Sequence, residues 1–277
     1  MKYFNSAIVL LVILLAAACT EKTLFVPQAD LVVVRGYLYA NEPVTEIQLS
    51  STLGLGSEDS IGPPISDAVV KLIKGGKTYQ LEPTPGRAGY YNYPGTDLSV
   101  NTGDNFRIEV TYFSKLASAE TVVPPAPVGV KMSVSELVVQ DVSTGGFGFG
   151  RPFMFEDTSA AKITWVNGDN SAYYVTLENV DTTLQQIGTG FPFGRFNRIV
   201  SIPTISDEYM ISLINVTYYG QYKAKIYRVN QEYVDLFSTR QQDSRDLNEP
   251  LSNIVNGLGI FTAFNSDSVF FRVVVPE

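Results

Sequence analysis

Short runs of β-branched and aromatic residues, separated by turn residues about every eight to twelve positions, most constrain how this chain can fold. Within 105–113, apolar residues alternate with polar ones, which is typical of a half-buried strand. The 16 Tyr and 16 Phe among 277 residues fit the same reading, since aromatic side chains favour strands. The pattern predicts an all-β protein built from sandwiches.

The first half of the chain predicts one complete sandwich. Its expected strands cover 31–39, 46–50, 68–74, 77–81, 89–93, 105–113 and 115–123. Gly75-Gly76 predicts a hairpin turn. The Pro-rich stretch 124–127 stops any strand and indicates a domain boundary. We therefore expect an N-terminal β-sandwich over 30–123, a linker over 124–129 and a C-terminal β-sandwich over 130–277.

The second half predicts another sandwich with one helical insertion. Its expected strands cover 130–142, 161–166, 173–177, 197–202, 208–217, 221–229 and 268–275. Ile163 and Trp165 share one strand face, which indicates a core with a buried tryptophan, as in fibronectin-type sandwiches. Asn230 is a good helix N-cap ahead of helically spaced apolar residues, so one short helix is expected near 230–240. The Gly-rich stretch 253–261 is read as a bend that re-enters the sheet, with a functional loop as the alternative.

The N-terminus has the pattern of an export signal that ends on a cysteine. Lys2 precedes an apolar run over 7–18, and Cys19 follows three alanines. This pattern predicts a signal peptide over 1–18, lipidation of Cys19 and an anchored linker over 19–29. One alternative is an uncleaved membrane helix, but the run is shorter than the roughly 20 residues of a bilayer span. The other is ordinary cleavage after Ala18, which would leave a free thiol.

Composition excludes several kinds of chemistry. The chain has no histidine and a single cysteine, so Ser-His-Asp and Cys-His nucleophiles and ordinary His-based metal sites are excluded. Its net charge of -8 argues against nucleic acid as a partner. The segment 167–170 (Asn-Gly-Asp-Asn) comes closest to a calcium loop, yet it reads better as a tight turn. We expect no enzyme activity, no cofactor and no metal.

Two near copies of a Gly-Phe-x-Phe-Gly-Arg motif stand out in stretches with little strand character. Glycines would allow tight loops that display two aromatic rings and a guanidinium. Such side chains are enriched at binding hot spots, which favours a contact surface; the alternative is that the two loops pack on each other. The candidate interaction residues are Phe147, Phe149, Arg151, Phe191, Phe193 and Arg195.

Several segments together resemble a known family. They are Cys19, the strand ending at 35–38 (Arg-Gly-Tyr-Leu), 64–70 (Pro-Ile-Ser-Asp-Ala-Val-Val), 249–254 (Glu-Pro-Leu-Ser-Asn-Ile) and 257–261 (Gly-Leu-Gly-Ile-Phe). Together they resemble the Bacteroidota lipoproteins of domain of unknown function 4249. The early part is also similar to carboxypeptidase-regulatory-like domains, which implies an immunoglobulin- or transthyretin-like first sandwich before a fibronectin-III-like second one.

The resemblance indicates where the protein is located in the cell and does not identify a reaction. Such lipoproteins are typically encoded beside TonB-dependent outer-membrane receptors, and no catalytic residues carry over. We expect a lipid-anchored outer-membrane protein that is a non-enzymatic accessory or ligand-capture partner of such a transporter. The sequence leaves open the ligand and the face of the membrane. The alternatives are a structural or adhesive cell-surface protein and a hydrolase that uses carboxylates.

Overall fold

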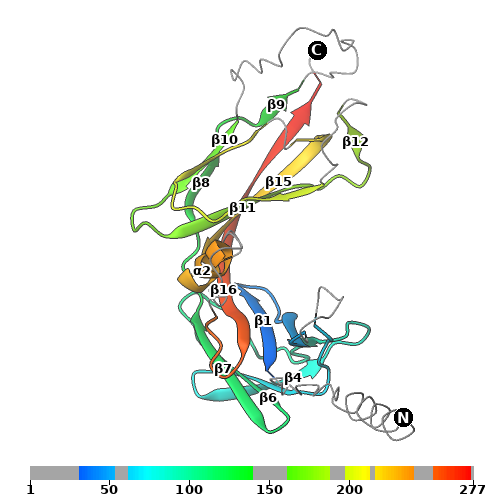
Figure 1. Cartoon of the computed structure of the whole chain (residues 1–277). Coiled ribbons are helices and arrows are strands. Elements are labelled where there is room, and N and C mark those ends of the chain that lie inside the picture. The colour runs from blue at the N-terminus through cyan, green and yellow to red at the C-terminus, as the bar shows by residue number, and fades with distance from the viewer. Residues whose placement is uncertain are drawn as a thin grey trace, which may run out of the picture. The chain divides into compact units, whose positions relative to one another are not determined.

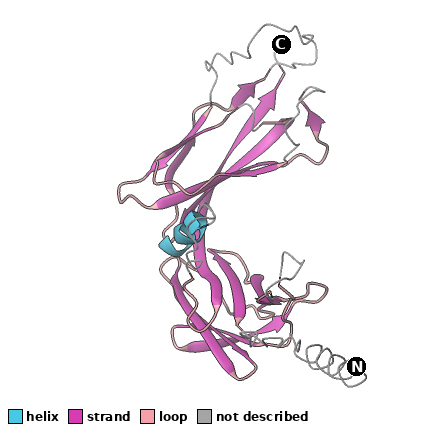
Figure 2. Cartoon of the chain, viewed as in Figure 1, coloured by secondary structure: helices cyan, strands magenta, loops and turns pink. Residues whose placement is uncertain are grey.

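The computed structural model is built almost entirely of strands (Figures 1 and 2). It describes residues 31–53, 62–139, 161–187, 197–212, 216–239 and 252–275. Within those ranges the one helix is α2 (Gln231–Thr239), so the predicted all-β fold with one short helix is confirmed. Residues Leu31–Glu277 group as one compact unit.

The first sandwich follows the predicted strands closely. Its strands are β1 (Val32–Tyr39), β2 (Glu46–Ser51), β3 (Val69–Lys74), β4 (Lys77–Pro83), β5 (Tyr90–Asn92), β6 (Asn105–Tyr112) and β7 (Lys115–Val122). The hairpin between β3 and β4 turns at Gly75 and Gly76, with φ of 55° and 79°. The hairpin between β6 and β7 takes the same left-handed conformation at Phe113 and Ser114, so this turn forms without glycine.

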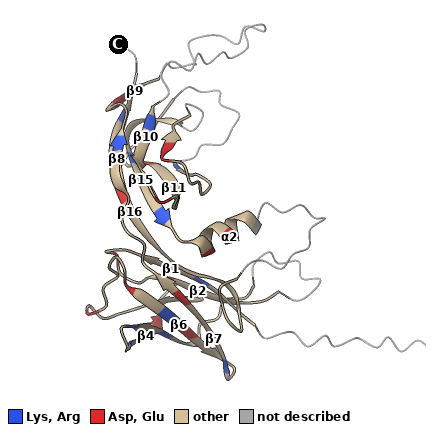
Figure 3. Ribbon diagram, turned by 90° about the vertical axis from the view of Figure 1, so that its left-hand side faces the viewer, with Lys and Arg blue, Asp and Glu red and all other residues tan. Residues whose placement is uncertain are grey.

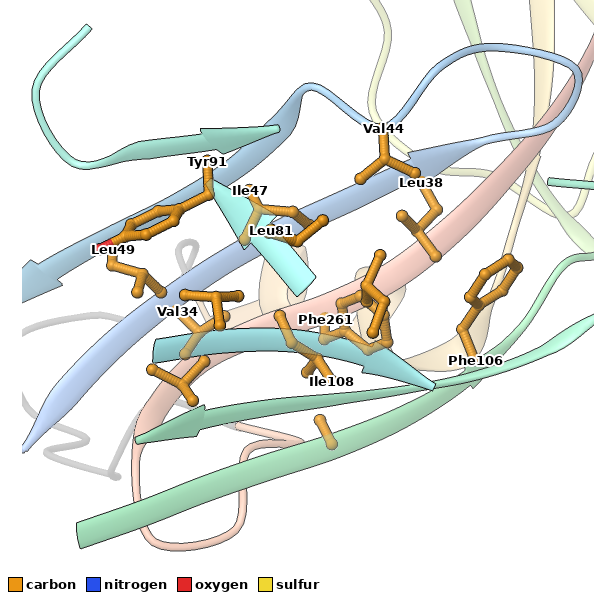
Figure 4. Packing of buried hydrophobic residues seen from close by; sticks show 14 of the residues in the cluster. Val34, Leu38, Val44, Ile47, Leu49, Leu81, Tyr91, Phe106, Ile108 and Phe261 are labelled. Atoms are coloured by element: carbon orange, nitrogen blue, oxygen red, sulfur yellow. The ribbon is translucent and has the colours of Figure 1, made fainter. Parts of the chain in front are cut away.

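Two layers enclose the first core. β4 pairs with β3 in one layer and with β5 in the other, so the sheet folds over on itself. Figure 4 shows the inward side chains meeting between the layers, among them Leu38, Ile47, Phe106 and Ile108. The free edge of β7 is bridged at Ser118, which exchanges two backbone hydrogen bonds with Val255.

The last strand, β16 (Leu258–Val274), is much longer than predicted. Residues 258–264 pair in parallel with β1, and residues 264–273 pair antiparallel with β15 (Tyr218–Val229). The expected bend over 253–261 is therefore confined to the residues before Leu258. Glycine is needed at position 259 because the backbone of β16 lies very close to that of β1 there. Its φ is +100°, and an added Cβ would lie 2.0 Å from the carbonyl oxygen of Val34.

The second sandwich packs a larger layer of strands against a three-stranded one. Its other strands are β8 (Val128–Met132), β9 (Glu136–Val138), β10 (Lys162–Val166), β11 (Ala172–Asn179), β12 (Gln185–Gln186), β13 (Arg198–Val200) and β14 (Glu208–Met210). The larger layer has the order β13-β11-β15-β16, with β9 paired to β16 and β12 paired to β15, and the smaller one is β14-β10-β8. Ile163, Trp165 and Tyr173 are buried between them, which confirms the predicted tryptophan core.

Besides the last strand, three predicted strands of this half have clearly different bounds. The expected strand 130–142 is two strands, because β8 pairs with β10 in one layer whereas β9 pairs with β16 in the other. The expected strand 208–217 ends at Met210, and β15 begins at Tyr218 instead of 221. Crossing between layers breaks an apolar run that sequence alone reads as continuous.

The predicted domain boundary at 124–129 stays a prediction, but the contacts around it are well defined. Ile254, Phe261 and Ala263 pack in the first core, while Phe271 and Val273 pack in the second. A single strand thus contributes to both cores (Figure 1).

Helix α2 lies against β16 and covers its second face. The backbone carbonyl of Asn230 accepts a hydrogen bond from the Tyr233 amide (3.1 Å), which starts the helix where it was predicted. Six successive residues of β16, 260–265, are buried, as a strand covered on both faces requires. Beside α2, aromatic rings form what we term the tyrosine cluster: Tyr37, Tyr39, Tyr174, Tyr227, Tyr233 and Phe264.

Candidate functional site: a cavity at the junction of the sandwiches

The residues that the sequence singled out lie outside the described part of the chain. This applies to the lipidation site Cys19 and to both Gly-Phe loops, with Phe147, Phe149, Arg151, Phe191, Phe193 and Arg195. Their roles stay predictions. The structure instead brings a different set of residues together.

A cavity of about 490 Å³ lies where the two sandwiches meet. We term it the junction cavity. The first sandwich and the segment after it supply residues 102–103 and 122–125 of its walls. The second supplies residues 169–172, Ile205 and residues 228–231, with Val234 of α2. Its volume falls in the range of ligand pockets, about 300–1,000 Å³.

One wall of the cavity is polar and is organised around Arg228. Its Nη2 forms an ion pair with Asp169 and donates a hydrogen bond to Ser171 Oγ (2.6 Å). The Arg228 side chain is only 17% exposed and lies over the Tyr173 ring, 6.0 Å from its centroid. The hydrogen bond from Ser171, followed by the Arg228 guanidinium, lowers the pKa of Asp169, so this carboxylate is ionised at neutral pH.

The turn over 167–170 holds Asp169 in place. Asn167 Oδ1 accepts the Ser171 backbone N–H (3.0 Å), and Asn167 Nδ2 donates to the Ile205 carbonyl (2.7 Å). Asn170 has a φ of 54°, a conformation that asparagine tolerates better than most residues. The predicted tight turn is thus observed, and it also places Ile205 beside the polar wall.

The facing wall is apolar. Val122, Pro124 and Pro125 form it, and the carbonyls of Val122 and Pro124 are already paired. The Val122 carbonyl accepts from Asn230 Nδ2 (2.8 Å), and the Pro124 carbonyl accepts from Asn265 Nδ2 (2.9 Å). Neither proline has an N–H to offer.

Polar side chains of the second half bind the first across this junction. Asn265 Nδ2 donates to Thr102 Oγ1 (2.8 Å) as well as to Pro124. Glu232 Oε1 accepts from Thr121 Oγ1 (2.8 Å) and from Thr262 Oγ1 (3.1 Å). Lys225 of β15 adds an ion pair with Glu42 at 3.0 Å. The walls of the cavity are therefore connected through specific hydrogen bonds.

The tyrosine cluster lies next to this network. Burial raises the pKa of the Tyr39 and Tyr174 hydroxyls far above the ordinary range, so both stay neutral at any physiological pH. These two hydroxyls therefore pack as neutral groups within the cluster and offer no ionised phenolate for chemistry.

Charged side chains are spread over the strands of both sandwiches with both signs mixed (Figure 3). No group of three Asp, Glu, Cys or His side chains within the described ranges is close enough to hold a metal ion. In the same ranges, no helix has the length and apolarity needed to cross a bilayer.

Sequence reasoning missed the junction cavity. The segment 167–170 contributes to the cavity wall, but its residue pattern indicates only a metal loop or a turn. The sequence around Arg228 does not indicate a binding site, because an arginine in an alternating strand normally points to solvent. Its side chain contacts Asp169, Ser171 and Tyr173, residues about 55–59 positions earlier in the chain, and no local pattern encodes that contact.

Comparison with solved structures gives remote similarity only. The FN1–FN3 domains of chicken CNTN1 share 10% identity with a TM-score of 0.26, covering 86% of this chain and 66% of theirs. A 1.5-MDa bacterial ice-binding adhesin shares 9% identity (TM-score 0.23; 88% of this chain, 65% of that one). A Ca2+-stabilized, ice-binding adhesin of an Antarctic bacterium shares 15% (TM-score 0.21; 88% and 49%). The chain thus spans about two thirds or less of each of these structures.

No curated protein matches the sequence. A family model does: the one described as domain of unknown function (DUF4249) matches residues 20–269. The chain therefore belongs to the DUF4249 family.

Proposed function

We propose that this chain is a non-enzymatic lipoprotein, anchored in the outer membrane through acyl chains on Cys19, that captures a ligand for a TonB-dependent transporter. The observation that carries the binding role is the junction cavity, which has the volume of a ligand site and is lined by an ion pair, amides and apolar side chains. The anchoring role is supported by the apolar run that ends at Cys19.

The absence of histidine from the sequence supports a binding role over a catalytic one. Among the described residues that line the cavity, the charged ones are Asp169 and Arg228, and they neutralise each other. A glycosidase needs two carboxyl groups that face one bond, whereas the described lining offers one.

The anchor is tested by metabolic labelling with palmitate in a bacterial host. The wild-type chain is expected to take up label and to sediment with membranes, and Cys19→Ala is expected to lose both. Thr20→Ala is the matched control, because it changes the neighbouring residue and keeps the thiol. Label that persists in Cys19→Ala, or an unlabelled wild type, would contradict lipidation at this residue.

The transporter partnership is tested by extraction of native membranes in a gentle detergent. A TonB-dependent receptor is expected to co-purify with the tagged chain. Recovery of the chain alone would count against the partnership. A deletion strain with normal nutrient uptake but lost attachment would favour the adhesive alternative.

A further inference from the structure

The charges balance among the described residues that line the junction cavity. The charged residues in this part of the lining are Asp169 and Arg228, and their ion pair satisfies both. An anionic or cationic ligand would have to break this pair or leave one charge of its own uncompensated, and both outcomes cost free energy in a partly enclosed site. The charge balance favours a neutral ligand.

Hydrogen-bond donors and acceptors are mixed on the polar wall. Arg228 uses Nη2 for its bonds to Asp169 and Ser171 and also interacts with the Tyr173 hydroxyl, so this wall presents a guanidinium with several N–H donors. Gln231 donates its Nε2 to Asp235 (2.8 Å), which leaves Oε1 as an acceptor. The exposed amide of Asn170 offers both kinds of group. A ligand hydroxyl group donates one hydrogen bond and accepts others, so a ligand rich in hydroxyl groups is complementary to this wall.

The apolar side chains of the facing wall are complementary to the apolar face of a ligand ring. Val122 and Pro125 are exposed there, and Ile205 is 66% exposed at the rim. An extended peptide fits poorly, because the prolines lack N–H groups and the Val122 and Pro124 carbonyls are already taken. A sugar ring presents C–H groups on its faces and hydroxyls at its edges, which is the division that the two walls show.

We propose that the junction cavity binds a neutral sugar unit, with the hydroxyls against Arg228, Asn170 and Gln231 and a ring face against the Val122–Pro125 wall. This inference rests on the proposed ligand-capture function and names the class of its ligand.

The test is binding by the full chain, purified in detergent, to fluorescently labelled maltotriose, cellotriose, xylotriose and chitotriose. Trigalacturonic acid and a labelled tripeptide library serve as charged and peptidic competitors. At least one neutral trisaccharide is expected to bind. Asn170→Gly, which keeps the positive φ and removes the amide, is expected to weaken that binding about tenfold.

The matched pair is Ile205→Asp and Ile202→Asp. Both side chains are well exposed, at 66% and 59%, but only Ile205 lines the cavity. Ile205→Asp is expected to weaken binding about tenfold or more, while Ile202→Asp stays within about twofold of wild type. Unfolding temperatures of both variants show whether either has lost its fold. If Ile205→Asp no longer folds, the effect of Asn170→Gly on sugar binding decides the test.

The inference is overturned if none of the four neutral trisaccharides binds, if trigalacturonic acid or a peptide binds better, or if neither cavity variant weakens binding. The same preparations report on palmitate labelling and receptor co-purification. If these persist while no sugar binds, the sugar assignment alone fails. If sugar binds while both are lost, the assignment stands and the transporter role fails.

Discussion

Replacing Phe264 with alanine is expected to destabilise the protein more than any other single truncation in the tyrosine cluster. Phe264 is 2% exposed and sits on β16 at the point where the strand stops pairing with β1 and begins pairing with β15. Its ring centroid lies 5.2 Å from that of Tyr39 and 5.0 Å from that of Tyr233. It also contacts Tyr37, Tyr174 and Tyr227.

The expected loss has two parts. Truncation of a buried phenylalanine costs about 3–5 kcal/mol through lost burial and the cavity left behind. Because five aromatic neighbours surround the ring, and each edge-on or stacked pair is worth about 0.5–1.5 kcal/mol beyond burial, the cost should fall at the upper end, near 5 kcal/mol. Since these rings come from strands of both sandwiches, the variant should also unfold in two steps where the wild type unfolds in one.

Urea denaturation followed by far-UV circular dichroism and tyrosine fluorescence measures both effects. Phe270→Ala is the matched control, because it lies on the same strand but is 54% exposed, and it should cost under about 1 kcal/mol. A loss below about 2 kcal/mol for Phe264→Ala, or equal losses for the two variants, would refute the assignment of Phe264 to a packed junction.

Three further outcomes are expected. Gly259→Ala should cost roughly 3 kcal/mol or more in urea denaturation, because it combines a positive φ with a clash against β1; Gly75→Ala, with open space around it, should cost about 1 kcal/mol. The hydrogen bond from Lys77 lowers the pKa of Asp97 to about 2, so the stability it contributes is present above its unfolded-state pKa and is lost as the pH falls through about 2. In carboxyl NMR titrations, Lys77→Met should move that midpoint up toward the ordinary value of about 3.9. Asn265→Ala should cost about 1–3 kcal/mol in the same urea assay, since it leaves the buried Pro124 carbonyl without its donor.

Local sequence patterns predicted most of the first sandwich, because its turns and the burial of its strands depend on residues that are close in the sequence. Gly75-Gly76 sets the turn, and the alternation within 105–113 sets which side chains are buried, so strands and hairpins follow from neighbours in sequence. The predicted bend over 253–261 is shorter in the structure and ends before Leu258, and the reason is long-range. Gly257 and Gly259 read as breakers, yet glycine at 259 is required where β16 approaches the β1 backbone. That contact joins residues more than 220 positions apart.

The candidate site was harder to predict than the fold. Asp169 was recognised as part of a turn, whereas Arg228 and Pro125 carry no motif. The cavity exists because the ends of β7 and β15 lie near the start of β11. A hydrogen-bond network made of Asn230, Glu232 and Asn265 fixes that meeting. Asparagine and glutamate in such positions look like ordinary polar residues until the partner segment is known.

Two different features hold the cavity together, and they differ in strength. The covalent continuity and backbone ladder of β16 keep the two sandwiches attached. The spacing of the cavity walls depends instead on Asn230 and Asn265, whose amides reach the carbonyls of Val122 and Pro124. Such bonds contribute about 1 kcal/mol each, small beside the burial of the two cores. Substitution at these few side chains can therefore widen the cavity or change its shape while the fold persists, because the stability lost is small beside the burial of the two cores.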